Sequence, residues 1–285
     1  MARSQCRSSL LRARPVTIGL VVLVLSLLTP LAVAAVPTSD FYEGGADIYD
    51  DWDVCRTRGD GGDGFLQYVG GDFDPIIAYE SMGENANSAY VTGFRLAQEF
   101  PDSDVRAEAI FAYARDGVKY TSDRSQFGHV EFAQNADELA NVIAEEGIAY
   151  GDCEDYAFLL GVMYVGAGMR SAIVLAPDHA ATLVYLPGYV GANRVLTLEG
   201  EEGWIWAEAT GGNNPLGWMP DQYMRVELVA RELTDVGLPT PAPQTKPVAE
   251  ITRHHGTEFS LPVPPFWLIM LVLWLIARVG RRRTA

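Results

Sequence analysis

Lysine is nearly absent from this 285-residue chain, in which Lys119 and Lys246 are the only two. Basic residues number 21 against 37 acidic ones, and eight of the basic residues are arginines within 1–36 and 261–285, where no acid occurs. The other 13 face all 37 acids in residues 37–260, which gives that region a net charge of −24. Nucleic acids attract positively charged surfaces, so we expect no nucleic-acid partner.

Cysteine is also scarce. Cys6 lies in the basic N-terminal segment, which leaves Cys55 and Cys153, and the chain has no C-x-x-C pair. We therefore expect no zinc site. A disulfide between Cys55 and Cys153 is one interpretation for an exported domain. The residues around Cys153 favour a nucleophile instead, which would leave Cys55 a lone thiol.

Apolar runs long enough to cross a bilayer are found only near the two ends. Val16–Val36 follows an arginine-rich start and contains Ala32-Val33-Ala34, which is typical of a signal-peptide cleavage site. It is also long enough to remain as an uncleaved anchor. Leu261–Val279 ends in arginines, which mark the cytoplasmic side; the alternative is a short amphipathic or sorting tail. The sequence thus predicts a protein of the cell membrane with an extracytoplasmic domain.

These features divide the chain into six predicted segments. They are a signal peptide or signal anchor (1–36), a Gly/Asp-rich segment (37–85), the main folded domain (86–235), a Pro-rich linker (236–260), a transmembrane helix (261–279) and a basic cytoplasmic tail (280–285). Oxygen ligands suit calcium, so the aspartates of 37–85 leave a calcium loop open as an alternative to a solvated loop. No EF-hand spacing occurs there, and we expect no other cofactor.

Apolar periodicity predicts the elements of the main folded domain. The first helix is expected to bury Tyr90, Val91, Phe94 and Leu96, and Gly147 is expected to end the third. Residues 120–129 read as a loop. The predicted helices cover 88–100, 103–118, 135–146 and 153–165, the predicted strands cover 170–176, 180–186, 194–198 and 203–209, and a last strand or short helix falls within 223–233.

The run 151–156, G-D-C-E-D-Y, stands directly before the fourth predicted helix. Asp152 can accept hydrogen bonds from the free N–H groups of the first turn, which puts Cys153 at the first helical position. The helix dipole and unpaired N–H groups favour a thiolate there. We therefore predict a nucleophile that needs a histidine as base and a third group to orient it. The alternative is a buried core cysteine.

Two later residues can supply those groups. His179 begins a predicted strand, and Glu208 shares one face of another with Trp204 and Trp206 by period two. A carboxylate on an aromatic face needs a partner when buried, and an imidazole is a natural one. The alternatives are a structural histidine and a solvated charge at a sheet edge.

The ordered set G-D-C-E-D-Y (151–156), D-H-A (178–180) and W-A-E-A-T (206–210) resembles the transglutaminase-like superfamily of papain-like cysteine enzymes. K-Y-T-S-D (119–123) and N-A-D-E-L (135–139) extend the resemblance, which covers about 90 residues. It implies an α+β fold with helices packed on an antiparallel sheet and a Cys-His-Glu triad. The chain departs from the family in having no aromatic residue soon after the histidine, and Glu where Asp is common.

The resemblance implies acyl transfer from a protein or peptide substrate. Cys153 would attack a carbonyl, His179 would take and return the thiol proton, and Glu208 would hold the imidazole. Hydrolysis by a protease or amidase is favoured; the alternatives are a transglutaminase that cross-links or deamidates glutamine, and a non-catalytic surface binding module. Gln134 is a candidate oxyanion donor, and Asp155, beside Asp152, is expected to brace the local fold.

Overall fold

The computed structural model describes residues 40–69, 72–234, 249 and 251–253. The predicted signal segment, C-terminal transmembrane helix and basic tail lie outside these residues, as does most of the predicted linker. Among the described residues, no helix combines the length and the apolar character that a membrane crossing requires. The predictions on export and anchoring therefore stay predictions.

The described residues form an α+β fold, as predicted. Its largest sheet has the strand order β11-β7-β8-β10-β9, with every neighbouring pair antiparallel. β5 and β6 form a separate parallel pair. The strands in the described residues are β1 (Phe41–Gly44), β2 (Asp47–Asp50), β3 (Tyr68–Val69), β4 (Asp72–Phe73), β5 (Val118–Tyr120), β6 (Ala149–Gly151), β7 (Ser171–Ala176), β8 (His179–Tyr185), β9 (Val195–Leu198), β10 (Glu201–Ala207) and β11 (Val229–Glu232).

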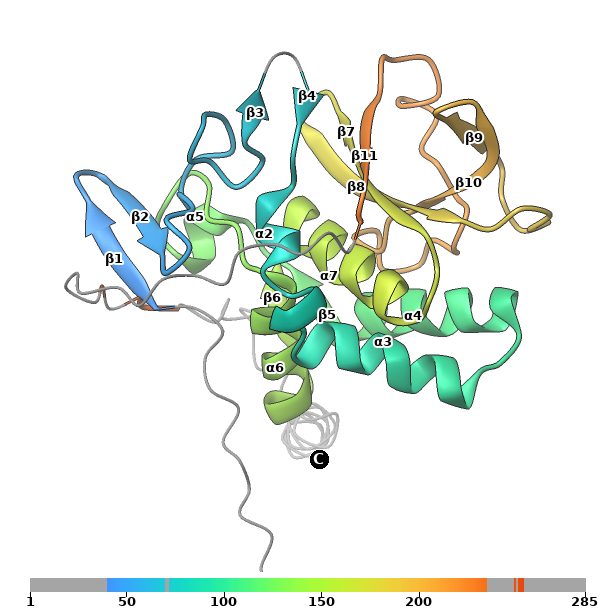
Figure 1. Ribbon diagram of the computed structural model, residues 1–285, viewed down its shortest axis with the longest axis horizontal. Helices are drawn as coiled ribbons and strands as arrows, with labels where there is room; N and C mark the ends of the chain where they lie inside the picture. Colours follow the sequence, from blue (N-terminus) through green and yellow to red (C-terminus); the bar gives the residue numbers. More distant parts are fainter. Residues whose placement is uncertain (1–39, 70–71, 235–248, 250, 254–285) are drawn as a thin grey trace, which may run out of the picture. The chain divides into compact units, whose positions relative to one another are not determined.

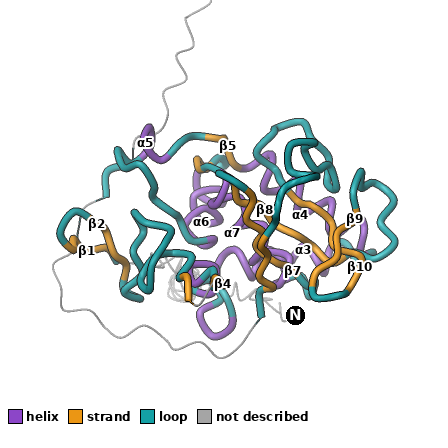
Figure 2. The backbone as a smooth tube through the Cα atoms, turned by 90° about the horizontal axis from the view of Figure 1, so that it is seen from above, coloured by secondary structure: helices purple, strands orange, loops and turns teal. Residues whose placement is uncertain are grey.

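Helix α7 lies between this sheet and the other long helices (Figures 1 and 2). Its residues are apolar on all sides, and nearly all of them are buried, as expected of a helix enclosed by other elements. This arrangement confirms the prediction of helices packed on an antiparallel sheet. In the described residues the helical elements are α2 (Ile76–Tyr79), the 3-10 turn η2 (Gly83–Asn85), α3 (Ser88–Glu99), α4 (Ser103–Gly117), α5 (Asp123–Gln126), α6 (Ala136–Glu146) and α7 (Cys153–Gly166).

Glycine sets the distance between α7 and its neighbours. A Cβ on Gly161 would come within 2.9 Å of Leu233 and 3.1 Å of Ile173, so the glycine lets α7 approach the sheet. A Cβ on Gly93 of α3 would meet the Met163 carbonyl oxygen at 2.0 Å. The backbones of α3 and α7 therefore touch through a small residue.

This contact overturns part of the predicted inner face of α3. Val91 and Phe94 are each 54% exposed, whereas Leu96 is buried as predicted, together with Ala89 and Gly93. The periodicity argument weighted large apolar side chains, but close backbone packing selects small ones. The face of α3 that meets α7 is therefore rotated from the one predicted.

Side chains close to the helix ends cap them. Asp102 accepts from the first turn of α4, Asn135 forms a capping box with Glu138 at the start of α6, and Gly147 ends α6 with φ 85°, as predicted. The loop predicted over 120–129 is wrong, since it contains the end of β5 and the short helix α5. These elements position part of the candidate site.

The Gly/Asp-rich segment is joined to the main domain by a buried arginine. The Arg56 guanidinium lies 2.9 Å from Glu80 and 3.1 Å from Glu138 of α6, and it also contacts Asp50. All four side chains are almost fully buried. The segment therefore belongs to the folded unit.

The C-terminal part of the predicted linker also packs. The Ala249 N–H donates to the Phe41 carbonyl, and Ile251 packs against the cluster of Ile48 and Phe132. Residues 249 and 251, which lie within the predicted Pro-rich linker, therefore contact the folded unit.

Candidate active site

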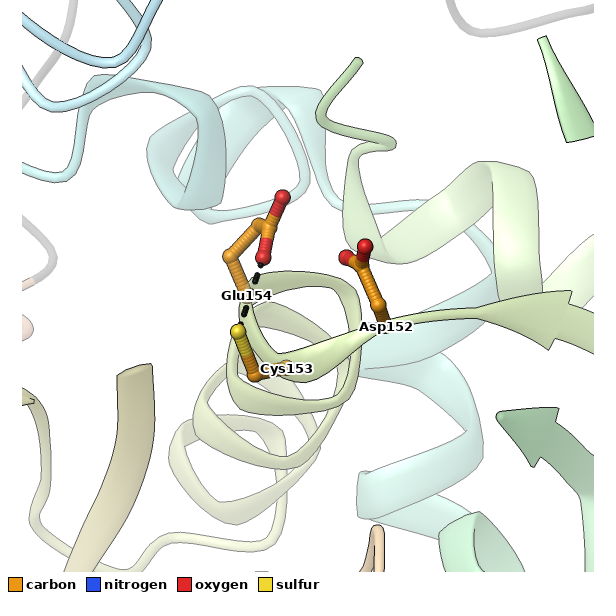
Figure 3. A group of neighbouring side chains, drawn as sticks. All are labelled: Asp152, Cys153 and Glu154. Carbon is orange, nitrogen blue, oxygen red and sulfur yellow. Dashed lines mark hydrogen bonds between the residues drawn. The ribbon is translucent and has the colours of Figure 1, made fainter. Parts of the chain in front are cut away.

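Cys153 is the first residue of α7, as predicted, and Asp152 precedes it as the N-cap. The thiol is partly buried and donates to Glu154 Oε2 at 3.2 Å (Figure 3). The backbone N–H of Ala180 in β8 lies near enough to the sulfur to oppose the rise of the thiol pKa. Because α7 packs against β8 and Ala180 follows His179, the sulfur lies beside the strand that carries the predicted base.

His179 and Glu208 meet at the neighbouring ends of β8 and β10. The two strands pair antiparallel with Thr182 opposite Ala207, so the first residue of β8 and the residue after β10 come together. His179 Nε2 lies 3.1 Å from Glu208 Oε1, and both side chains are 11% exposed. The contact is close but is not aligned as a hydrogen bond, a looseness that is common at catalytic pairs without substrate.

Glu208 is held in place by its own neighbours. The Trp206 indole N–H donates to Glu208 Oε2 at 3.1 Å, and the Thr210 hydroxyl donates to Oε1 at 2.5 Å. Burial raises the pKa of the Glu208 carboxyl, but the contacts with His179, Thr210 and Trp206 outweigh burial and leave the pKa below its usual value. Glu208 is therefore a carboxylate at neutral pH, as an orienting group must be.

The predicted alternative of a Cys55–Cys153 disulfide is not formed. Both thiols are free, and Cys55 is fully buried beside Thr57. Cys153 instead lies near Glu154 and the start of β8. The Thr182 hydroxyl of β8 donates to the Ala157 carbonyl of α7 at 2.7 Å, which holds the strand against the helix.

Gln134 and Asp155 form one buried brace. The Gln134 side-chain amide donates to the Tyr150 carbonyl at 2.9 Å and to Asp155 Oδ2 at 2.7 Å. Asp155 also accepts the backbone N–H groups of Gln134 and Asp152. Asp155 thus fixes the start of α7, as expected. Both amide hydrogens of Gln134 are used within the brace, so the structure does not support its role as an oxyanion donor.

Acidic side chains gather around the start of α7. We refer to Asp123, Glu131, Asp152, Glu154 and Asp155 as the acidic cluster; groups of three, one of which includes the Cys153 sulfur, have ligand atoms within 4.8 Å of one another. One carboxylate oxygen on each of Asp123, Asp152 and Glu154 is buried without a hydrogen-bond partner. Asp123 is 1% exposed and Glu154 6% exposed.

This crowding keeps protons on the cluster. Burial, followed by the nearby carboxylates, raises the pKa of Asp123 and of Asp152 to about 8 and that of Glu154 to about 7. Burial and the Glu154 charge raise the pKa of the Cys153 thiol as well, and the Ala180 N–H offsets this only in part. The expectation that the helix start lowers the thiol pKa is therefore wrong, because these effects exceed the helix dipole.

The acidic cluster could hold a hard divalent cation. Calcium takes six to eight oxygen ligands from carboxylates, carbonyls and water, and three buried carboxylate oxygens here have no other partner. The predicted alternative of calcium among the aspartates of 37–85 has less support. Asp63 pairs there with Arg58, and Asp72 and Asp74 pair with Arg231.

The sequence argument missed Asp123 and Glu131 as members of the site. Asp123 is the last residue of the K-Y-T-S-D motif and caps no predicted helix, so only its place within that motif could have drawn attention to it. Compared with known protein families and with curated proteins, the chain has no match. The argument for function therefore depends on the geometry of these side chains.

Proposed function

We propose that this chain is a transglutaminase-like cysteine acyl-transfer enzyme with Cys153, His179 and Glu208 as its triad, acting on protein or peptide substrates. The observation that carries the proposal is the meeting of His179 and Glu208 at 3.1 Å at the end of β8, the strand that packs against the helix whose first residue is Cys153. Hydrolysis, as by a protease or amidase, is the favoured outcome.

The roles follow from which atoms face one another. Because Nε2 of His179 faces Glu208, Nδ1 accepts the thiol proton. The thiolate attacks the substrate carbonyl carbon, and the oxyanion is stabilised by backbone N–H groups at the start of α7. His179 returns the proton to the leaving amine as the C–N bond breaks. Water, deprotonated by the same imidazole, then hydrolyses the thioester and frees the thiol.

The raised pKa of the thiol opposes the first step, and the acidic cluster is its largest electrostatic cause after burial. Asp123, Asp152 and Glu154 would hold a divalent cation such as calcium, and its positive charge would offset these carboxylates and favour the thiolate near neutral pH. The cation holds no substrate in this scheme; the triad residues carry out every step.

The acidic cluster also favours one second candidate. A site rich in carboxylates attracts cationic groups, and a lysine amine is the acyl acceptor of a transglutaminase. Acyl transfer to an amine would use the same thioester and the same three residues. Measuring ammonia release with and without an added primary amine, together with incorporation of that amine, separates this reaction from hydrolysis.

Alkylation of the full chain with iodoacetamide across pH tests the proposal. We expect Cys153 to react with a midpoint below the ~8.5 of an ordinary thiol when calcium is present, and only at higher pH when calcium is chelated. Mass spectrometry of the peptide that contains residue 153 separates this thiol from Cys55, which is buried and serves as the control. If His179→Ala leaves the calcium-dependent midpoint unchanged, the triad assignment is wrong.

A further inference from the structure

Two aromatic rings lie against the His179 imidazole. The Tyr223 ring is parallel to it, at 1° between the planes and 5.0 Å between the centroids. The Trp206 ring lies 6.5 Å from the imidazole at 25°, and 5.8 Å from Tyr223 at 24°. Offset parallel stacks at these distances are attractive. The three rings thus lie against one another in one group, which we call the stack, and the predicted base is one of its members.

The loop that carries Tyr223 is tied to the sheet, so the stack has a fixed support. The Asn193 side chain donates to the Met219 carbonyl at 3.0 Å and accepts the Met219 N–H at 2.9 Å. The Gly217 N–H donates to the Trp206 carbonyl at 3.0 Å, which joins the same loop to β10. Met219 is buried against the sheet. Tyr223 therefore extends from a loop that is anchored on both sides of residue 218.

Glu208 and Tyr223 constrain different motions of the imidazole. Glu208 contacts one nitrogen of the imidazole, which leaves the ring free to tilt about that contact. A ring stacked on its face opposes tilting. The titratable groups near the imidazole are Glu208 after β10, Tyr223 on its face, and Cys153 at the start of α7, the helix that packs against β8.

We propose that Tyr223 is a positioning residue that fixes the plane of the His179 imidazole, so that Nε2 faces Glu208 while Nδ1 faces the nucleophile. An aromatic face also attracts a cation, so the stack favours the imidazolium formed when the thiol gives up its proton. This inference rests on the proposed function for its catalytic consequence, but the stack itself can be detected without catalysis.

The test compares Tyr223→Leu, which removes the ring, with Tyr223→Phe, which keeps it. Trp218→Leu is the matched control, because Trp218 is on the same loop and 43% exposed. With the full chain carrying labelled histidine, NMR of the four histidines, assigned by His179→Gln, reports the ring current on His179. We expect the His179 ring signals to move downfield in Tyr223→Leu and to stay in place in the other two variants.

Activity gives the second readout. A stacking contact is worth about 1 kcal/mol, or about five- to tenfold in rate. We expect kcat to fall by that factor in Tyr223→Leu with KM unchanged, and the acid limb of the kcat/KM profile to move to lower pH, because the imidazolium loses the contact that favours it. Tyr223→Phe should restore both.

The outcomes separate this inference from the proposed function. Unmoved His179 signals in Tyr223→Leu would overturn the stack, and so would an effect of Trp218→Leu as large as that of Tyr223→Leu. Equal loss of kcat in Tyr223→Phe would mean that the hydroxyl group, not the ring, acts. If the His179 signals move as expected but the wild-type protein neither hydrolyses substrate nor shows a reactive Cys153, the stack stands and the proposed function fails.

Discussion

Replacing Asp123 with asparagine should stabilise the protein when no divalent cation is present. The Asp123 carboxylate is 1% exposed, and one of its oxygens has no hydrogen-bond partner among acidic neighbours. Its other oxygen accepts the Phe132 N–H at 2.6 Å, a bond that an asparagine oxygen can keep. The new amide N–H groups would then face the carboxylates of Asp152 and Asp155. The substitution thus removes one buried negative charge and puts two N–H donors in its place.

The size of the effect follows from the raised pKa. The pKa of Asp123 rises from 3.8 to about 8 on folding, so the folded protein binds this proton more tightly than the unfolded chain. The protonated Asp123 carboxyl therefore favours the folded state fully below pH 4, and this contribution to stability is lost as the pH rises through about 8. Four pKa units correspond to about 5–6 kcal/mol. The protonation of Asp123 is coupled to that of Asp152 and Glu154, so one substitution removes only part of this free energy. We expect about half of it, about 2–3 kcal/mol, from Asp123→Asn.

Thermal unfolding followed by circular dichroism measures the effect at pH 5 and pH 8. At pH 8 with a chelator, we expect the Tm of Asp123→Asn to exceed that of the wild type by about 5–10 °C, with little difference at pH 5. Calcium should raise the Tm of the wild type at pH 8 and act much less on the variant. Sodium chloride at matched ionic strength is the control for screening.

Asp116→Asn is the matched variant, because Asp116 is an exposed aspartate paired with Arg115. Such surface substitutions change stability by less than about 0.5 kcal/mol. The reasoning would be refuted if Asp123→Asn lowered the Tm at pH 8 without calcium, or if calcium stabilised it as much as the wild type. In either case the cluster would not be a set of uncompensated carboxylates.

Two further predictions address the triad and the fold. Glu208→Gln should lower kcat by on the order of 10²–10⁴-fold, whereas Cys153→Ser should abolish activity, because the orienting group contributes less than the nucleophile. Equal losses of kcat in steady-state assays of the two variants would contradict the assigned roles. Arg56→Met should lower the free energy of unfolding by about 3–5 kcal/mol, because Asp50, Glu80 and Glu138 would stay buried without their cation. Urea titration measures this, and Arg58→Met, whose side chain is 39% exposed, should have a much smaller effect.

Local sequence patterns predicted the elements that depend on neighbours along the chain. The start of α7 at Cys153 and the end of α6 at Gly147 were both found at the expected residue, because capping involves groups within a few residues. Where α3 was concerned, periodicity located the helix but misjudged its inner face at Val91 and Phe94.

The sequence by itself determined the α+β class, the order of Cys153, His179 and Glu208 along the chain, and the position of the cysteine at a helix start. Only the tertiary structure decided the electrostatics of that position. Asp123 comes from a segment 30 residues before Cys153, and the Tyr223 ring comes from a loop 44 residues after His179. A helix dipole is a local property, whereas the pKa of a thiol depends on every charge within a few ångströms. Burial of the thiol in the folded protein, together with the charges of the adjacent Glu154 and Asp152, therefore reversed the predicted direction of its pKa shift.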